Sequence, residues 1–248
     1  MRWLALFLFV SCSVATSLAQ YGTTYSNLDD QTTLDGGAGK PGWGWCTGSS
    51  CAGGVNSATA YSTSLVGWPS LDRRSRQFYL YAQSPYTNAL WWYKLGVSSS
   101  ATRFKFDLRF YIDQNAASNA QAFEFDTFQN YNSQRYTFGM QCDLATHTWD
   151  VWNGANGSWV HTQLACNGFS PNRWHHLTLH YHRSSDSNMH YDSLTLDGVS
   201  ASVGYTEPSY MLPAGWVNNL GVQFQLDTDA NGGQMTMWVD SVSLSSWQ

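Results

Sequence analysis

The clearest structural signal in the chain is a strict alternation of apolar and polar residues between Arg103 and Asp113. Phenylalanine, leucine and isoleucine occupy every second position, and charged residues or tyrosine occupy the positions between them. A period of two residues over this length is typical of a β-strand with one buried face and one face toward solvent. The segment therefore predicts an amphipathic strand in a half-buried sheet.

Four further segments, at 121–128, 135–142, 174–183 and 221–227, alternate in the same way. A turn over 228–233 then leads into a final strand near 234–244. Short runs of this kind, separated by glycine, asparagine, serine and aspartate, are typical of all-β proteins. The pattern predicts about a dozen strands in two antiparallel sheets that pack face to face.

The region from Gly36 to Gly54 differs in composition from the rest of the chain, because it is rich in glycine and contains Trp43, Trp45 and a cysteine pair. Tryptophans and a disulfide have no use in a flexible tether, so we predict a long ordered loop. We expect neither tryptophan to belong to the core.

The low content of charged residues limits the classes of fold and function that this chain can have. The 248 residues include 12% charged side chains and 16% aromatic ones, with a formal net charge of −5. Typical soluble domains carry about 25% charged residues, and the scarcity of glutamate and lysine disfavours an all-helical fold. The chain has no basic stripe, which argues against a nucleic-acid partner.

Residues 1–19 have the pattern of a cleavable secretory signal peptide. Arg2 supplies the positive start, residues 3–10 are apolar, and Ser17-Leu18-Ala19 is a small-x-small cleavage site. An uncleaved N-terminal anchor is the alternative. We expect residues 20–248 to form a single domain, exported to the periplasm or the cell exterior, without a membrane span.

Cysteine usage agrees with export. Cys12 leaves with the signal peptide, and four cysteines remain, which allow three pairings. Cys46–Cys51 would close a tight Gly/Ser loop, and Cys142–Cys166 would join segments flanking a predicted hairpin, so we favour these two bonds. A metal site is disfavoured by the missing Cys-x2-Cys spacing and the oxidising compartment.

The polar faces of the predicted strands carry amides, imidazoles, carboxylates and aromatic rings in place of lysine and glutamate. Planar amides and rings suit a ligand with many hydroxyls and apolar ring faces, which is a carbohydrate. An ordinary solvated surface is the alternative interpretation. The residues expected to bind the ligand are Trp43, Trp45, Glu124, Asp126, Trp174, His176, His180, Gln223 and Gln225.

Several stretches resemble the concanavalin A-like lectin/glucanase superfamily. Glu124-Phe-Asp-Thr-Phe-Gln-Asn130 resembles the metal-site strand of legume lectins. Asn172–Leu179 and Leu194–Gly198 resemble a hairpin of laminin-G-like domains, and the closing strand Met237–Leu244 fits the same superfamily. The resemblance covers roughly residues 104–244 and implies an all-β, concanavalin A-like jelly-roll sandwich of two antiparallel sheets. Its motifs are more specific for the fold than for function.

In legume lectins, the residues that match Glu124, Asp126 and Asn130 hold a transition metal and calcium. The family also needs an aspartate and a histidine where this chain has Arg135 and Met140. These replacements remove two ligands and add a positive charge, so we predict no two-metal site of this type. We hypothesise that the Arg135 guanidinium balances the carboxylates that a metal would otherwise neutralise.

Glucanases of the same superfamily carry a Glu-x-Asp-x-x-Glu motif. Glu124 and Asp126 match its first two acids, but Gln129 stands where the acid/base glutamate should be. Retaining hydrolysis needs two carboxyl groups, one of which donates a proton, and an amide cannot do so. This departure disfavours a hydrolase.

The histidines leave two further alternatives. His176, His180 and His182 would share one face of a strand, which suits zinc or copper but lacks a fixed third ligand. Histidine with Tyr136 and Arg135 could instead serve β-elimination on uronic acids, as in polysaccharide lyases. For an enzyme, the candidate catalytic residues are Glu124, Asp126, His176 and His180.

The segment Asp227-Thr-Asp-Ala-Asn-Gly232 matches the first half of a calcium loop, with Asp227, Asp229 and Asn231 as candidate ligands. Its twelfth position is Trp238 in place of glutamate, and its flanks are predicted strands. A hairpin turn is therefore favoured over a structural calcium site, although both stay open.

Together these features favour a secreted, non-catalytic carbohydrate-binding protein whose partner is a polysaccharide or an oligosaccharide. A polysaccharide-degrading lyase or hydrolase on the same fold is the first alternative, and a structural or adhesion module is the second. Apart from the candidate calcium, we expect no cofactor.

Overall fold

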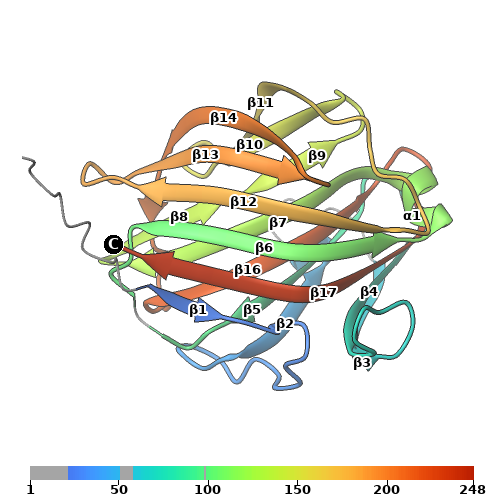
Figure 1. The fold of residues 1–248 in the computed structure, drawn as a ribbon, viewed down its shortest axis with the longest axis horizontal. Helices are drawn as coiled ribbons and strands as arrows, with labels where there is room; N and C mark the ends of the chain where they lie inside the picture. Colours follow the sequence, from blue (N-terminus) through green and yellow to red (C-terminus); the bar gives the residue numbers. More distant parts are fainter. Residues whose placement is uncertain (1–21, 51–57, 98) are drawn as a thin grey trace, which may run out of the picture.

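The computed structural model describes residues 22–50, 58–97 and 99–248. The predicted signal peptide, residues 1–19, lies outside the described residues. The described chain folds into two antiparallel sheets that lie one behind the other in Figure 1, with a short helix at one end. The all-β sandwich predicted from the alternation is confirmed.

One sheet has eight strands in the order β14-β13-β12-β6-β17-β4-β3, and β1 pairs with β17. Its neighbouring strands are antiparallel. The strands are β1 (Thr23–Tyr25), β3 (Ala58–Val66), β4 (Ser75–Ala82), β6 (Arg103–Ile112), β12 (Trp174–Arg183), β13 (Asn188–Leu196), β14 (Val199–Pro208) and β17 (Gly233–Trp247).

The other sheet has nine strands, which are also antiparallel. Its order is β11-β10-β9-β7-β16-β5-β2, with β8 paired to β7 and β15 paired to β8. The strands are β2 (Gly42–Thr47), β5 (Asn88–Lys94), β7 (Ala120–Tyr131), β8 (Gln134–Phe138), β9 (Met140–Asp143), β10 (Thr148–Asn153), β11 (Ser158–Ala165), β15 (Tyr210–Met211) and β16 (Asn219–Thr228).

Two short helices complete the described elements, α1 (Gln114–Asn119) and the single 3-10 turn η1 (Gly48–Ser50). The Asp113 side chain caps α1 by accepting a hydrogen bond from the Ala116 backbone N–H at 2.7 Å. No helix in the described ranges is both long and apolar enough to cross a membrane.

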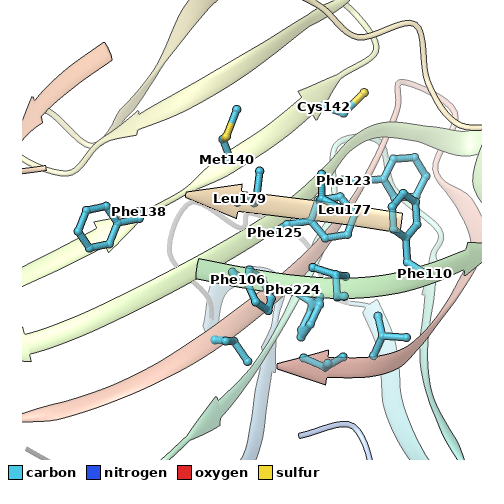
Figure 2. Packing of buried hydrophobic residues seen from close by; sticks show 14 of the residues in the cluster. Phe106, Phe110, Phe123, Phe125, Phe138, Met140, Cys142, Leu177, Leu179 and Phe224 are labelled. Carbon is cyan, nitrogen blue, oxygen red and sulfur yellow. The ribbon is translucent and has the colours of Figure 1, made fainter. Parts of the chain in front are cut away.

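The core lies between the two sheets and is built from the alternating apolar residues. Figure 2 shows Phe106, Phe110, Leu177 and Leu179 of the eight-stranded sheet packing against side chains of the other sheet. The facing side chains labelled there are Phe123, Phe125, Phe138, Met140, Cys142 and Phe224. The predicted inward faces of these strands are therefore confirmed.

One predicted strand, at 135–142, is divided into β8 and β9 at Gly139. A Cβ atom at Gly139 would lie 2.8 Å from the Cβ of Trp152, so only glycine fits this close approach. The interruption leaves both halves paired with β7 and keeps their apolar side chains in the core.

The long loop predicted for 36–54 is wrong in its central part, because residues 42–47 form strand β2. Trp43 is only 2% exposed and belongs to the core. Its indole Nε1 donates to the Leu28 carbonyl oxygen at 3.2 Å, and its ring packs 5.3 Å from the Tyr93 ring. The expectation that Trp43 would not be a core residue is therefore corrected.

The predicted Cys142–Cys166 disulfide is confirmed, with its Cα atoms 5.6 Å apart. It ties β9 to the chain that follows β11 across the two intervening hairpins. Cys51 lies outside the described residues, so the Cys46–Cys51 bond stays a prediction.

Candidate functional site

A groove with a volume of about 1130 Å³ crosses the outer face of the nine-stranded sheet. Strands β5, β7, β9 and β16 line it with the side chains that alternate with their core residues. Residues 37–39 and 215–217 and the strands β11 and β15 also contribute to its lining. The groove therefore lies on the polar face that the alternation predicted for β7 and β16.

Two carboxyl groups meet in this groove, because Glu124 of β7 and Asp227 of β16 share a hydrogen bond. Gln225 bridges them, since its Nε2 donates to Glu124 Oε1 and also, at 3.0 Å, to Asp227 Oδ1. Burial raises the pKa of Glu124 well above its usual value, and it raises the pKa of Asp227 to about 6. Burial therefore disfavours the charged form of both carboxyl groups, and most strongly that of Glu124.

Asp126 lies two residues further along β7 on the same face. Its Oδ1 accepts a hydrogen bond from the Met140 backbone N–H at 3.2 Å, and its Oδ2 accepts one from Gln223 Nε2 at 3.3 Å. Burial raises the pKa of Asp126 to about 7, although the Arg135 guanidinium acts in the opposite direction. Arg135 thus lies close enough to compensate this carboxylate, as the sequence hypothesis requires.

The Arg135 side chain is fixed by three hydrogen bonds. It donates to Gln223 Oε1 at 2.7 Å, to Asn130 Oδ1 at 3.0 Å and to Tyr210 Oη at 3.0 Å. Burial lowers the pKa of this guanidinium from its usual value. Gln223 therefore links the cation Arg135 to the acid Asp126 through the two ends of one amide.

Two aromatic rings contact this cation. The guanidinium carbon of Arg135 lies 4.7 Å from the ring centroid of Phe128 and 4.8 Å from that of Trp216. Such contacts stabilise a cation through the negative face of each ring. The Trp216 ring thereby becomes part of the groove although it comes from a loop.

Indole rings line the groove over its length: Trp92, Trp152, Trp159 and Trp216. Trp92 Nε1 donates to Asp35 Oδ2 at 2.9 Å. A Cβ atom on Gly44 would meet the Trp92 ring at 2.5 Å, so glycine at this position leaves the space for the indole. Trp152 and Trp159 contact each other edge to face, with their centroids 5.1 Å apart.

The structure brings four of the predicted ligand-binding residues into the groove: Glu124, Asp126, Gln223 and Gln225. Trp43 is in the core, as described above. Trp45 is 46% exposed but is not among the groove residues. The expectation that the two tryptophans of the glycine-rich region line this site is therefore corrected.

Trp174, His176 and His180 lie on β12, in the eight-stranded sheet, and alternate there with core residues. They share its outer face, as predicted, and β12 pairs with β6 and β13 in that sheet. This outer face is on the opposite side of the sandwich from the groove. The expectation that these residues join Glu124 and Asp126 in one site is therefore wrong.

The candidate lyase set is divided in the same way. Tyr136 is buried in the core, Arg135 lies in the groove, and His176 and His180 lie on the other sheet. His176 Nε2 instead lies 3.1 Å from Asp107 Oδ1, within hydrogen-bonding distance in the eight-stranded sheet. These residues do not form a common site.

The residues at the legume-lectin metal positions do not fit those metals. The Asn130 amide oxygen accepts a hydrogen bond from Arg135, and the Met140 side chain is in the core. Gln129, at the position of the glucanase acid/base residue, donates through Nε2 to the Ala101 carbonyl oxygen at 3.0 Å. It is buried and is absent from the groove lining among the described residues.

The candidate calcium ligands are also separated. Asp227 lies in the groove beside Glu124, whereas Asp229 accepts hydrogen bonds from the backbone N–H and the side-chain amide of Asn231, at 2.7 and 3.0 Å. Gly232 closes the turn by donating to the Asp229 carbonyl oxygen at 3.2 Å. The segment therefore forms a turn, but this turn leads from β16 of the nine-stranded sheet to β17 of the eight-stranded sheet, so the favoured hairpin is corrected to a turn between the two sheets.

Comparisons with protein-family models and with curated proteins find no match.

Solved structures of similar fold include arcelin-5, a lectin-like defense protein from Phaseolus vulgaris. Its sequence is 11% identical, the alignment covers 92% of this chain and 99% of arcelin-5, and the TM-score is 0.48. The winged bean acidic lectin complexed with methyl-α-D-galactose has 11% identity, coverage of 92% and 99%, and a TM-score of 0.47. The cellulose-induced protein Cip1 has 12% identity, coverage of 82% and 90%, and a TM-score of 0.47. At this low identity, the likeness concerns the fold alone.

Proposed function

We propose that this protein binds carbohydrate in the groove of the nine-stranded sheet. The observation that carries this proposal is the presence of indole rings and fixed planar amides in one groove: Trp92, Trp152, Trp159, Gln223 and Gln225. Indole faces pack against the apolar faces of sugar rings, and amides and carboxyls exchange hydrogen bonds with hydroxyl groups. The groove volume of about 1130 Å³ slightly exceeds the usual range for small-molecule pockets, about 300–1,000 Å³. We therefore favour an oligosaccharide or a segment of a polysaccharide.

The charges of the groove favour a neutral glycan over a uronate. Its acids include Glu124, Asp126, Asp143 and Asp227. Of the cations that line it, Arg135 is occupied by its hydrogen bonds, and Lys94 Nζ lies 2.6 Å from Asp35 Oδ2. A carboxylate on each sugar would face these acids, and among the described residues of the lining the one remaining basic side chain is His161, which itself contacts Asp150 at 3.0 Å.

Binding without cleavage is the form of this function that the geometry favours. Glycoside hydrolysis needs two carboxyl groups about 5–5.5 Å apart for retention or about 6.5–9.5 Å apart for inversion. Glu124 and Asp227 instead share a hydrogen bond, whereas both mechanisms keep their two carboxyl groups apart. This pair does not have the arrangement of either mechanism.

The test is binding of a glycan panel, followed by calorimetric titration with the best neutral oligosaccharide. Trp159→Ala should weaken binding several-fold, because one aromatic stacking contact is worth about 1 kcal/mol. The matched control is Trp174→Ala, which removes a half-buried indole from the outer face of the other sheet and should leave the affinity unchanged.

Parallel assays for reducing ends and for unsaturated uronates check turnover. Release of either product from a bound glycan would replace the binding proposal with a glycan-cleaving enzyme. Binding to proteins or cell surfaces in the absence of any glycan binding would favour an adhesion module.

We also propose that the protein is exported. The confirmed disulfide Cys142–Cys166 supports this, because such bonds persist in oxidising compartments. N-terminal sequencing of protein from the producing cells should find Gln20 as the first residue. A chain that retains Met1–Ala19 and stays in the cytoplasm would contradict this proposal.

A further inference from the structure

A separate group of polar side chains lies where β9, β10 and β11 meet the groove. Asp143, Asp150 and His161 come from these three neighbouring strands, and one potential ligand atom from each lies within 4.8 Å of the other two. Asp150 and His161 stand directly opposite each other in the β10–β11 pairing. The pairing of three strands thus brings two carboxylates and an imidazole to one point.

The Asp150 carboxylate is held rigidly. Its side chain is 0% exposed. Gln141 Nε2 donates to its Oδ2 at 3.0 Å, and Thr148 Oγ1 donates to its Oδ1 at 2.7 Å. Outer hydrogen bonds of this kind orient a carboxylate that ligates a metal.

Asp143 supplies an independent observation. The residue is only 6% exposed and lines the groove, and its Oδ1 accepts hydrogen bonds from the backbone N–H groups of Ala145 and Thr146, at 2.7 and 3.3 Å. Among residues 22–50, 58–97 and 99–248, its Oδ2 has no hydrogen-bond partner. A carboxylate oxygen that lines the groove and accepts no hydrogen bond from these residues is available as a ligand for a cation.

His161 gives access to the cluster from solvent. Its side chain is 57% exposed, and its Nδ1 lies 3.0 Å from Asp150 Oδ1. The deprotonated imidazole of His161 and the Asp150 carboxylate are each metal ligands, and the exposed imidazole ring is the one of the two that has room to adjust.

We propose that Asp143, Asp150 and His161 bind a divalent transition metal ion, for which Zn²⁺ is the probe. An imidazole with two carboxylate oxygens suits zinc better than calcium, which prefers six to eight oxygen ligands. Three protein ligands leave coordination positions for water on the groove side. This site is distinct from the acids Glu124 and Asp126, and it does not depend on carbohydrate binding.

The experiment uses the full mature chain after treatment with a chelator. Calorimetric titration with ZnCl2 should show one ion bound per chain, and Co²⁺ substitution should give visible absorption bands that report histidine and oxygen ligation. His161→Ala and Asp143→Asn should each lower the zinc affinity at least tenfold. His161→Gln provides a second variant in case the alanine variant does not fold.

The matched control is His176→Ala, because His176 also pairs with an aspartate, Asp107, but on the opposite sheet. This variant should keep the zinc affinity of the original protein. The proposal is overturned if zinc does not bind saturably, in which case His161 and Asp150 form an ion pair only. It is equally overturned if Asp143→Asn and the His161 variants are folded and bind zinc as tightly as the original chain. Glycan titrations in the presence of the chelator test the carbohydrate proposal separately.

Discussion

At the scale of single residues, the groove contains several buried ionisable groups, and each of them forms a hydrogen bond with a side-chain amide. Glu124, Asp126 and Arg135 are all buried. Burying a charge costs several kcal/mol unless hydrogen bonds or an opposite charge compensate it. Gln223 contacts both Asp126 and Arg135, and Gln225 contacts Glu124. Because these contacts exist before a ligand arrives, the polar groups are already oriented, which lowers the entropic cost of binding.

The buried acids make stability depend on pH in a definite direction. The pKa of Asp126 is raised from 3.8 to about 7 in the folded protein, and Asp29, elsewhere in the fold, has the same shift to about 7. The folded state therefore keeps protons that the unfolded state has released, so this contribution is complete below about pH 4 and is lost as the pH rises through about 7.

We therefore expect denaturant titrations to give a larger free energy of unfolding at pH 5 than at pH 8, and Asp126→Asn to make the difference smaller. The amide stays neutral at both pH values, so it removes the titration of this one group. The Asp29 contribution should persist in the variant. An undiminished pH dependence in a folded Asp126→Asn protein would contradict the protonation assigned to Asp126.

At the scale of elements, alternation predicted strands well wherever one face meets the core and the other is polar. Residues 174–183 form β12 with the predicted bounds, and 103–113 form β6 to within one residue. Alternation of apolar and polar residues does not identify the two faces of β5, because both carry a tryptophan. Trp91 points into the core and its neighbour Trp92 points into the groove. Hydrophobicity alone does not distinguish a core indole from a ligand-binding one, so the groove tryptophans were missed.

Strand β2 was missed for a related reason, since its glycines indicate a loop when the sequence is considered alone. Gly44 is instead required by the close approach of the Trp92 ring. The adjacent Trp43 packs against Phe78, with ring centroids 5.6 Å apart, and against Arg76, whose guanidinium carbon is 4.3 Å from its ring. The glycine at position 44 therefore indicates close packing against the Trp92 indole and not a flexible loop.

This packing predicts opposite outcomes for two neighbouring tryptophans. Trp43→Ala should lower the free energy of unfolding by about 3–5 kcal/mol, as large-to-small changes in cores do. Trp45→Ala removes a half-exposed ring and should change stability by less than about 1 kcal/mol. Equilibrium unfolding in urea measures both. Equal losses in the two variants would contradict the placement of Trp43 in the core.

At the scale of the whole molecule, the sandwich presents two outer faces with different chemistry. Trp174, His176 and His180 of β12 lie on one face, and the acids and amides of β7 and β16 lie on the other. Local sequence patterns indicate which residues of a strand point outward, but they do not indicate which sheet the strand joins. That choice depends on pairing between distant segments, such as β7 with β16, and this is why the sequence combined residues of both faces into one site.

The central claim is that the groove of the nine-stranded sheet holds the glycan. A crystal structure with the best-binding neutral oligosaccharide tests it most directly. We predict sugar rings packed on Trp92 or on the Trp152–Trp159 pair, with hydroxyl groups bonded to Gln223, Gln225 or the adjacent acids. An oligosaccharide bound on the outer face of the eight-stranded sheet, beside Trp174, with the groove empty, would contradict the account.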